Sequence, residues 1–113
     1  MDKVLESVAT TGGASVNLAT GTAPNGGYMV SRAGSELVLD GLSRDDLAQF
    51  AQAYHEELDS SDTYLGVWED AETGLVYLDI SDNMDDLDAA WDVGIERGQL
   101  AIYAVKQEET IRL

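Results

Sequence analysis

Two short apolar segments on either side of a polar turn constrain the fold of this chain most strongly. Residues 64–68 read Tyr-Leu-Gly-Val-Trp and residues 75–80 read Leu-Val-Tyr-Leu-Asp-Ile, and both are rich in the aromatic and β-branched residues that favour strands. Residues 69–74 between them are polar and end in a glycine, as hairpin loops often do. The sequence therefore predicts a β-hairpin over residues 64–80.

Helical spacing of apolar residues occurs on both sides of this hairpin. Residues 43–46, Ser-Arg-Asp-Asp, have the form of a capping box, and the apolar residues that follow predict an amphipathic helix over residues 44–58. A second helix is predicted to begin at Ser81 or Asp82, either of which can cap it, and to end at Gly98. Its expected apolar stripe consists of Met84, Leu87, Trp91 and Ile95.

Further strands are predicted before the first helix and after the second, at residues 28–32, 36–40, 100–105 and 110–113. The expected order is ββ-α-ββ-α-ββ. This order indicates an α+β domain over residues 28–113, with a mostly antiparallel sheet and both helices packed on one face.

The N-terminal residues 1–27 have a different character. Residues 10–27 hold five glycines and the only proline and carry no charge, which favours turns or a flexible arm. Val16 and Leu18 fall on one face of a short extended segment, so an additional edge strand is the alternative. The sequence leaves both structures open.

Composition indicates a folded protein of one domain. The chain has 113 residues, of which 44% are hydrophobic, enough for one modest core. It contains no cysteine, which excludes disulfides and thiolate chemistry. No segment resembles a signal peptide or approaches the ~20 apolar residues of a membrane span. We therefore expect a cytoplasmic protein that does not bind membranes.

The charge of the chain is extreme and unevenly distributed. Acidic residues outnumber basic ones by 22 to 6, for a net charge of −16, and residues 40–96 contain Arg44 as their only base against 17 acidic residues. Such a field repels nucleic acid phosphates and anionic membranes and attracts basic proteins. The expected partner is therefore a basic protein, most naturally one that binds nucleic acid, and direct binding to nucleic acid is excluded.

The second predicted helix carries a row of carboxylates at helical spacing. Asp85, Asp88, Asp92 and Glu96 repel one another on one helix face, and no basic residue relieves them before Arg97. Their spacing is too wide to imitate a DNA duplex alone, so nearby acids would have to contribute. The alternative is an ordinary solvated helix face.

The predicted hairpin carries aromatic residues on the face away from the core. If Leu65, Val67 and Leu78 face inward, alternation sends Trp68 and Tyr77 to the other face. Aromatic residues bordered by carboxylates are typical of protein-binding hot spots. The alternative is that the N-terminal segment or a second subunit covers this face, which would make the protein a homodimer.

Metal and catalytic motifs are weak. The acidic residues 79–88 lack the glycine and glutamate positions of an EF-hand, and a helix cap explains them. His55 is the sole histidine and falls on the polar side of the first helix, as a surface residue does. No phosphate loop, nucleophile elbow or HExxH sequence is present. We expect no metal, no cofactor and no catalytic residue, and hence no enzyme.

Four segments carry a resemblance to known proteins. Residues 26–31, 64–70, 76–81 and 97–103 read Gly-Gly-Tyr-Met-Val-Ser, Tyr-Leu-Gly-Val-Trp-Glu-Asp, Val-Tyr-Leu-Asp-Ile-Ser and Arg-Gly-Gln-Leu-Ala-Ile-Tyr. In these segments the chain resembles small acidic accessory proteins of Gram-positive, actinobacterial phages and mobile elements, which have no assigned activity. By analogy, this setting implies a counter-defence role against restriction or CRISPR nucleases.

Together these features predict a non-catalytic acidic binding protein that occupies the basic nucleic-acid-binding surface of a host nuclease or other DNA-binding protein, as a DNA mimic does. The alternative is a structural or self-assembling accessory protein, dimerised through the aromatic hairpin face, whose acidity serves solubility. The residues expected to contact the partner are Trp68, Tyr77, Glu69, Asp70, Glu72, Asp79, Asp82, Asp85, Asp86, Asp88, Asp92 and Glu96.

Overall fold

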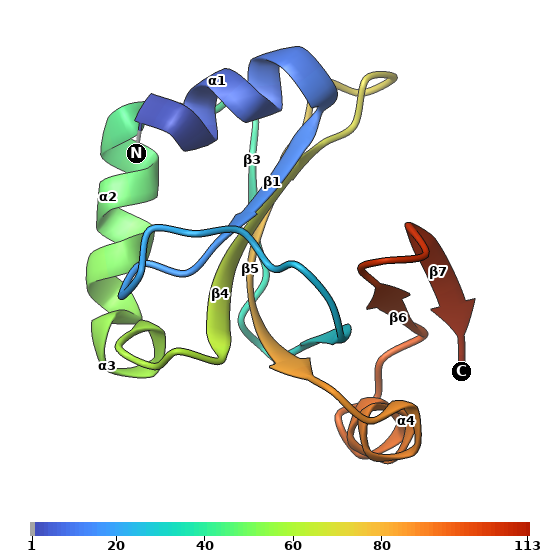
Figure 1. Ribbon diagram of the computed structural model, residues 1–113. Helices are drawn as coiled ribbons and strands as arrows, with labels where there is room; N and C mark the ends of the chain where they lie inside the picture. Colours follow the sequence, from blue (N-terminus) through green and yellow to red (C-terminus); the bar gives the residue numbers. More distant parts are fainter. Residues whose placement is uncertain (1) are drawn as a thin grey trace.

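The computed structural model describes residues 2–113, apart from the side chains of residues 2–4, 7 and 11. Its helices and strands are shown in Figure 1, and their order along the chain departs from the expected ββ-α-ββ-α-ββ by an added helix and strand at the N-terminus and by a division of the first predicted helix. The elements are α1 (Asp2–Thr11), β1 (Gly13–Val16), β2 (Tyr28–Ser31), β3 (Leu37–Leu39), α2 (Arg44–Ala53), α3 (His55–Leu58), β4 (Thr63–Glu69), β5 (Val76–Met84), α4 (Leu87–Glu96), β6 (Ala101–Ala104) and β7 (Glu109–Arg112).

One antiparallel sheet organises the molecule, which confirms the predicted α+β class. Its strand order is β1-β4-β5-β2-β6-β7, and β3 pairs with the first half of β5. The predicted hairpin forms from β4 and β5, with Trp68 opposite Tyr77 and Leu65 opposite Ile80. The second half of β5 pairs with β2, so this strand of nine residues joins two parts of the sheet.

All four helices pack on the same face of this sheet. Leu65, Leu78 and Ile80 are fully buried in a core under α1, α2 and α3, which contribute residues such as Leu47. A smaller core under α4 contains Val30, which lies opposite Asp82 of β5 and therefore shares the face of Leu78 and Ile80. The prediction that the helices cover one face is confirmed. The other face is curved and open between the β1–β4 and β6–β7 ends of the sheet (Figure 1).

The predicted helix over residues 44–58 forms, with one interruption. Ser43 caps α2 by accepting a hydrogen bond from the Asp46 N–H at 3.1 Å, as the capping-box sequence indicates. At Tyr54 the φ angle of −113° leaves the helical range, so the segment divides into α2 and α3. The rings of Tyr54 and Phe50 pack with centroids 4.9 Å apart.

The predicted start of the second helix at Ser81 or Asp82 is wrong. β5 continues to Met84 because residues 81–84 pair with β2, and α4 begins only at Leu87. Asp86 is its N-cap and accepts a hydrogen bond from the Ala89 N–H at 3.2 Å. Gly98, with φ of 71°, follows the helix in the left-handed conformation that favours glycine there, as expected.

The predicted packing face of this helix is also wrong. α4 buries Ala90 and Gly94, whereas Leu87, Trp91 and Ile95 are 38%, 40% and 54% exposed. A Cβ at Gly94 would lie 2.5 Å from the Leu113 side chain and 3.2 Å from that of Ile102, so the helix approaches the sheet through its smallest residues. The larger apolar residues are consequently turned outward.

The N-terminal residues form a helix that packs on the sheet and a strand that joins its edge. α1 was not predicted, and its Val8 belongs to the main core. Gly13–Val16 form the edge strand β1 against β4, and the buried Asn17 donates to the carbonyl oxygens of Ser60 at 2.8 Å and Thr63 at 3.1 Å. Within the described residues, no helix has the length and apolar character needed to cross a membrane.

Candidate functional site

The residues predicted to contact a partner are divided between the two faces of the sheet. Trp68, Tyr77 and Asp79 lie on the open face, where they line a groove of about 660 Å³. The acidic row of α4 belongs to a helix packed on the opposite face. The structure therefore does not bring the aromatic hairpin residues and the helical carboxylates into one patch, and each surface is described separately.

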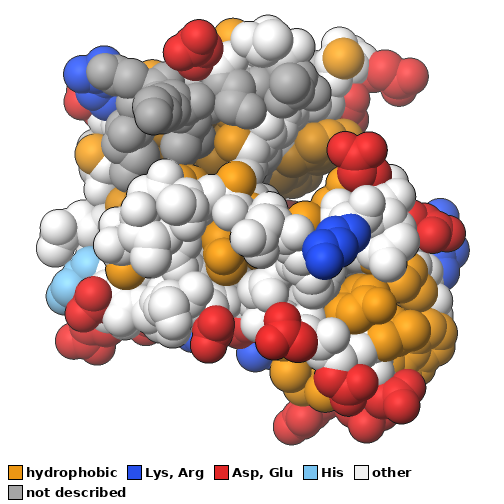
Figure 2. Space-filling view, viewed as in Figure 1, with side chains coloured by type: hydrophobic (Ala, Val, Ile, Leu, Met, Phe, Trp, Pro, Cys, Tyr) orange, Lys and Arg blue, Asp and Glu red, His pale blue; other side chains and the backbone are white. Residues whose placement is uncertain are grey.

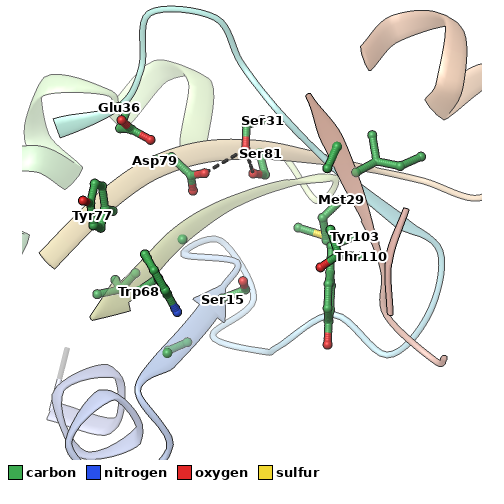
Figure 3. A pocket seen from close by; sticks show the side chains of 16 residues that line it. Ser15, Met29, Ser31, Glu36, Trp68, Tyr77, Asp79, Ser81, Tyr103 and Thr110 are labelled. Atoms are coloured by element: carbon green, nitrogen blue, oxygen red, sulfur yellow. Dashed lines mark hydrogen bonds between the residues drawn. The ribbon is translucent and has the colours of Figure 1, made fainter. Parts of the chain in front are cut away.

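Aromatic side chains form the sides of the groove. Trp68 and Tyr77 stack across the β4–β5 pair with ring centroids 5.3 Å apart and an interplanar angle of 34°. Trp68 is 54% exposed. Tyr103 of β6, beside Met29 of β2, stands on the other side of the groove (Figure 3).

Asp79 lies between these aromatic side chains, on the floor of the groove. The Ser31 hydroxyl donates a hydrogen bond to Asp79 Oδ2 at 2.8 Å, and the Ser31 and Ser81 hydroxyl oxygens are 3.2 Å apart (Figure 3). Burial raises the pKa of Asp79, and the hydrogen bond from Ser31 opposes the shift only in part. Gly66 pairs with Asp79 in the ladder and leaves the space that the Asp79 carboxylate occupies.

The outer surface of α4 carries two parallel rows of side chains. The exposed apolar row consists of Leu87, Trp91 and Ile95. The acidic row consists of the next residue after each of these, namely Asp88, Asp92 and Glu96, so the two rows run side by side along the helix. We call this surface the α4 face. Figure 2 shows hydrophobic side chains gathered around α4 and the β6–β7 end of the sheet, with acidic side chains along their border.

Asp82, one of the predicted contact residues, is held by several hydrogen bonds within the protein. Its carboxylate accepts hydrogen bonds from Arg32 at 2.8 and 2.9 Å, from Arg97 at 2.8 Å and from the Thr63 hydroxyl at 2.9 Å. Burial alone would raise the pKa of Asp82, but the hydrogen bonds from Arg32, Arg97 and Thr63 outweigh it and lower the pKa. The Arg97 guanidinium also donates to the Val30 carbonyl oxygen at 3.1 Å.

The remaining predicted contact residues are exposed or have local roles. Asp86 caps α4, and Asp85 precedes the helix, so it is not part of the predicted helical row; together with Lys106 it lines a separate depression. In the hairpin turn, Asp70 accepts a hydrogen bond from the Glu72 N–H at 2.9 Å, while Glu69 is exposed.

Acidic side chains also occur away from these surfaces. Glu56, Asp59 and Asp62 are exposed on and after α3, and Figure 2 shows acidic groups in several separate places. The acidity of residues 40–96 is therefore spread over the α3 region, the hairpin turn and α4. In the described part of the chain, no three His, Asp or Glu side chains are grouped so as to hold a metal ion.

Comparison with known proteins yields no match among family models, curated proteins or solved structures. The resemblance to phage accessory proteins therefore stays an interpretation of the sequence.

Sequence reasoning missed the groove itself. Tyr103 and Met29 were not singled out, because only the pairing of β2 with both β5 and β6 brings them near the hairpin. One local signal was available. A glycine inside a strand pattern, such as Gly66, often marks the close approach of another group, which here is the Asp79 carboxylate.

Proposed function

We propose that this protein is a non-catalytic acidic binding protein that docks through the α4 face onto a basic protein surface of the kind that binds nucleic acid. The observation that supports this most is the pair of adjacent rows on α4, one apolar and exposed and one acidic. Contiguous apolar surface bordered by polar residues commonly marks a protein-binding site.

The first support for the proposal is the exposed apolar row of α4, which can anchor a partner protein. Trp91 stands at the middle of the apolar row and is 40% exposed, with Leu87 and Ile95 one turn away on either side. Aromatic residues at the centre of an interface contribute most of its binding energy, often about 2 kcal/mol or more each. A partner with an apolar hollow would therefore bury Trp91.

The second support for the proposal is the orientation of the Arg97 side chain, which points inward, away from the acidic row. Arg97 is the base nearest to Glu96 in sequence, but its guanidinium binds Asp82 and the Val30 carbonyl oxygen. It therefore does not neutralise the acidic row. A basic partner surface would supply the missing positive charge, and the approach of such a partner would be accelerated at low salt.

The choice of a nucleic-acid-binding partner follows from the sign of these charges, because their spacing alone is too wide to imitate a duplex. Proteins that bind nucleic acid carry lysine and arginine clusters suited to rows of phosphates. An acidic row beside an apolar row can occupy such a cluster while the chain itself, at a net charge of −16, is repelled by nucleic acid. Such a protein would block its partner's nucleic acid site.

Absence of catalysis is part of the proposal. His55 is exposed, and its Nδ1 lies 3.0 Å from the Gln52 carbonyl oxygen within its own helical segment. This local contact of an exposed side chain supports a surface role for His55 rather than that of a general base.

Affinity capture tests this function. The protein is immobilised and exposed to a lysate of a Gram-positive bacterium at low salt, and bound proteins are eluted with duplex DNA and identified by mass spectrometry. We expect DNA to release nucleic-acid-binding proteins, and raised salt to reduce their capture. If DNA releases no such protein, or if light scattering shows a tight homodimer that Trp91→Ala on the α4 face disrupts, the proposal is wrong.

A further inference from the structure

We propose that the groove on the open face is a second binding site, which takes the lysine or arginine side chain of a basic peptide segment. The charged end of that side chain would meet Asp79, and its methylene groups would lie between Trp68 and Tyr103. This site stands on the geometry of the groove and does not depend on binding at the α4 face.

The floor of the groove supplies a carboxylate that is poorly compensated. Asp79 Oδ2 receives the hydrogen bond from Ser31 at 2.8 Å, while Oδ1 lies directly over Gly66, where a side chain of any other residue would displace it. Burial raises the pKa of Asp79, because the buried carboxylate is poorly solvated in its charged form. A cation placed against this carboxylate would restore the lost stabilisation.

Aromatic rings supply the second element of a cation site. Trp68 and Tyr77 stack at 5.3 Å on one side, and Figure 3 shows Tyr103 on the other side with Asp79 between them. Ammonium and guanidinium groups are attracted to the faces of such rings, and their aliphatic stems pack against them. The arrangement therefore suits a charged group carried on an apolar stem.

The charged side chains among the described residues that line the groove are all negative. Glu36 also lines it, and no lysine or arginine is among the described lining residues. An anionic ligand would meet two carboxylates with no counter-charge, and a neutral ligand would leave Asp79 uncompensated. Charge complementarity therefore selects a cation.

The size of the groove favours a peptide over a free cation. Residues from six strands, β1, β2, β4, β5, β6 and β7, line a volume of about 660 Å³, comparable with sites for much larger ligands. A single ammonium group would leave most of this volume empty. A peptide segment can fill the rest with the backbone and side chains that flank its basic residue.

Titration with short peptides tests the site. The probes are acetylated and amidated pentapeptides with lysine, arginine or norleucine between flanking alanines, and n-butylammonium chloride. Binding is followed by NMR through the Trp68 indole N–H and the amides of Gly66 and Tyr103. We expect the lysine and arginine peptides to bind at least ~10-fold more tightly than the norleucine peptide, from the charge-assisted contact and the aromatic rings together.

Substitutions distinguish binding in the groove from general electrostatic attraction by the negative charge of the protein. Asp79→Asn is expected to remove most of the ~10-fold preference for lysine over norleucine, and Trp68→Ala, at an exposed position, is expected to weaken all peptides. Asp59→Asn, exposed after α3 and outside both the groove and the α4 face, removes the same charge and is expected to leave the preference unchanged.

Three results would overturn the proposal. One is equal binding of the lysine and norleucine peptides. Another is an equal loss of preference in Asp59→Asn and Asp79→Asn, which would assign the effect to net charge. The third is n-butylammonium binding as tightly as the lysine peptide, which would identify the ligand as a small free cation.

Discussion

Arg97, which follows the last residue of α4, donates a hydrogen bond at 2.8 Å to Asp82 in β5. This bond fixes the C-terminal end of the helix to the sheet, because Asp82 also binds Arg32 and Thr63. It also determines the charge of the outer surface, since the guanidinium that follows Glu96 is turned inward. One ion pair thus links the packing of α4 to the acidity of its exposed face.

The first prediction concerns this ion pair. Replacing Asp82 with asparagine should lower the free energy of unfolding by about 2 kcal/mol, because two partly buried guanidinium groups lose their carboxylate. Asp92→Asn should change it by less than ~0.5 kcal/mol, since Asp92 is exposed on α4. Urea unfolding measures both, and similar effects of the two variants would refute the structural role of Asp82.

The second prediction concerns pH. The pKa of Asp82 is lowered by folding, so its stabilisation is full at neutral pH and is lost as the pH falls below the ordinary aspartate value through the lowered one. The pKa of Asp79 is raised, so the native state takes up a proton there first, and this uptake favours folding as the pH falls through the raised value.

NMR titration of the side-chain carboxyl carbons measures both groups. Asp79 is expected to titrate above the ordinary aspartate range and Asp82 below it. In unfolding experiments, Asp79→Asn should lose stability more steeply than the wild type as the pH falls through the raised pKa of Asp79 toward the ordinary aspartate value. The reverse order of the two pKa values would contradict the geometry of both carboxylates.

The third prediction concerns the space under Asp79. Gly66→Ala places a methyl group where the Asp79 carboxylate lies, and should destabilise the protein by about 1–3 kcal/mol. Gly41→Ala is the matched control, because no atom lies within 4 Å of its added methyl group. Adding Asp79→Ser to the Gly66→Ala variant should restore part of the lost stability, as measured by chemical unfolding. Additive effects of the two substitutions would mean that the groups do not touch.

The fourth prediction concerns the close approach of α4 to the sheet. A methyl group at position 94 would lie 2.5 Å from Leu113 Cδ1, so Gly94→Ala should cost stability despite the ~1 kcal/mol gain in helix propensity. In a Leu113→Ala background the clash is removed, and Gly94→Ala should become favourable. Thermal unfolding of the four proteins in this cycle gives the coupling, and a coupling near zero would contradict the observed packing.

The parts of the fold that were predictable depend on local patterns. The hairpin follows from two alternating segments around a polar turn, and the start of α2 follows from its capping box at Ser43. Both signals are contained in a few neighbouring residues. The antiparallel sheet with helices on one face followed from the order of such elements.

The errors arose where distant residues decide the outcome. Asp82 is an aspartate, a residue type that often caps helices, but its hydrogen bonds with Arg32 and the pairing of β5 with β2 hold it in a strand. On α4, periodicity identified the apolar row of Trp91 correctly but not which face is buried, because Gly94 and Ala90 allow a closer approach to the sheet than Trp91 does. The groove likewise requires β2, β5 and β6 to be placed together.

The central claim is that the α4 face binds a basic partner, and it is tested most directly by measuring the affinity of the captured protein for two charge variants. One variant combines Asp88→Asn, Asp92→Asn and Glu96→Gln on α4. The other combines Glu56→Gln, Asp59→Asn and Asp62→Asn near α3, and so loses the same three negative charges elsewhere. We predict about a tenfold loss of affinity at low salt for the α4 variant and little change for the other. Equal losses in the two variants would contradict the claim, because binding would then depend on net charge alone.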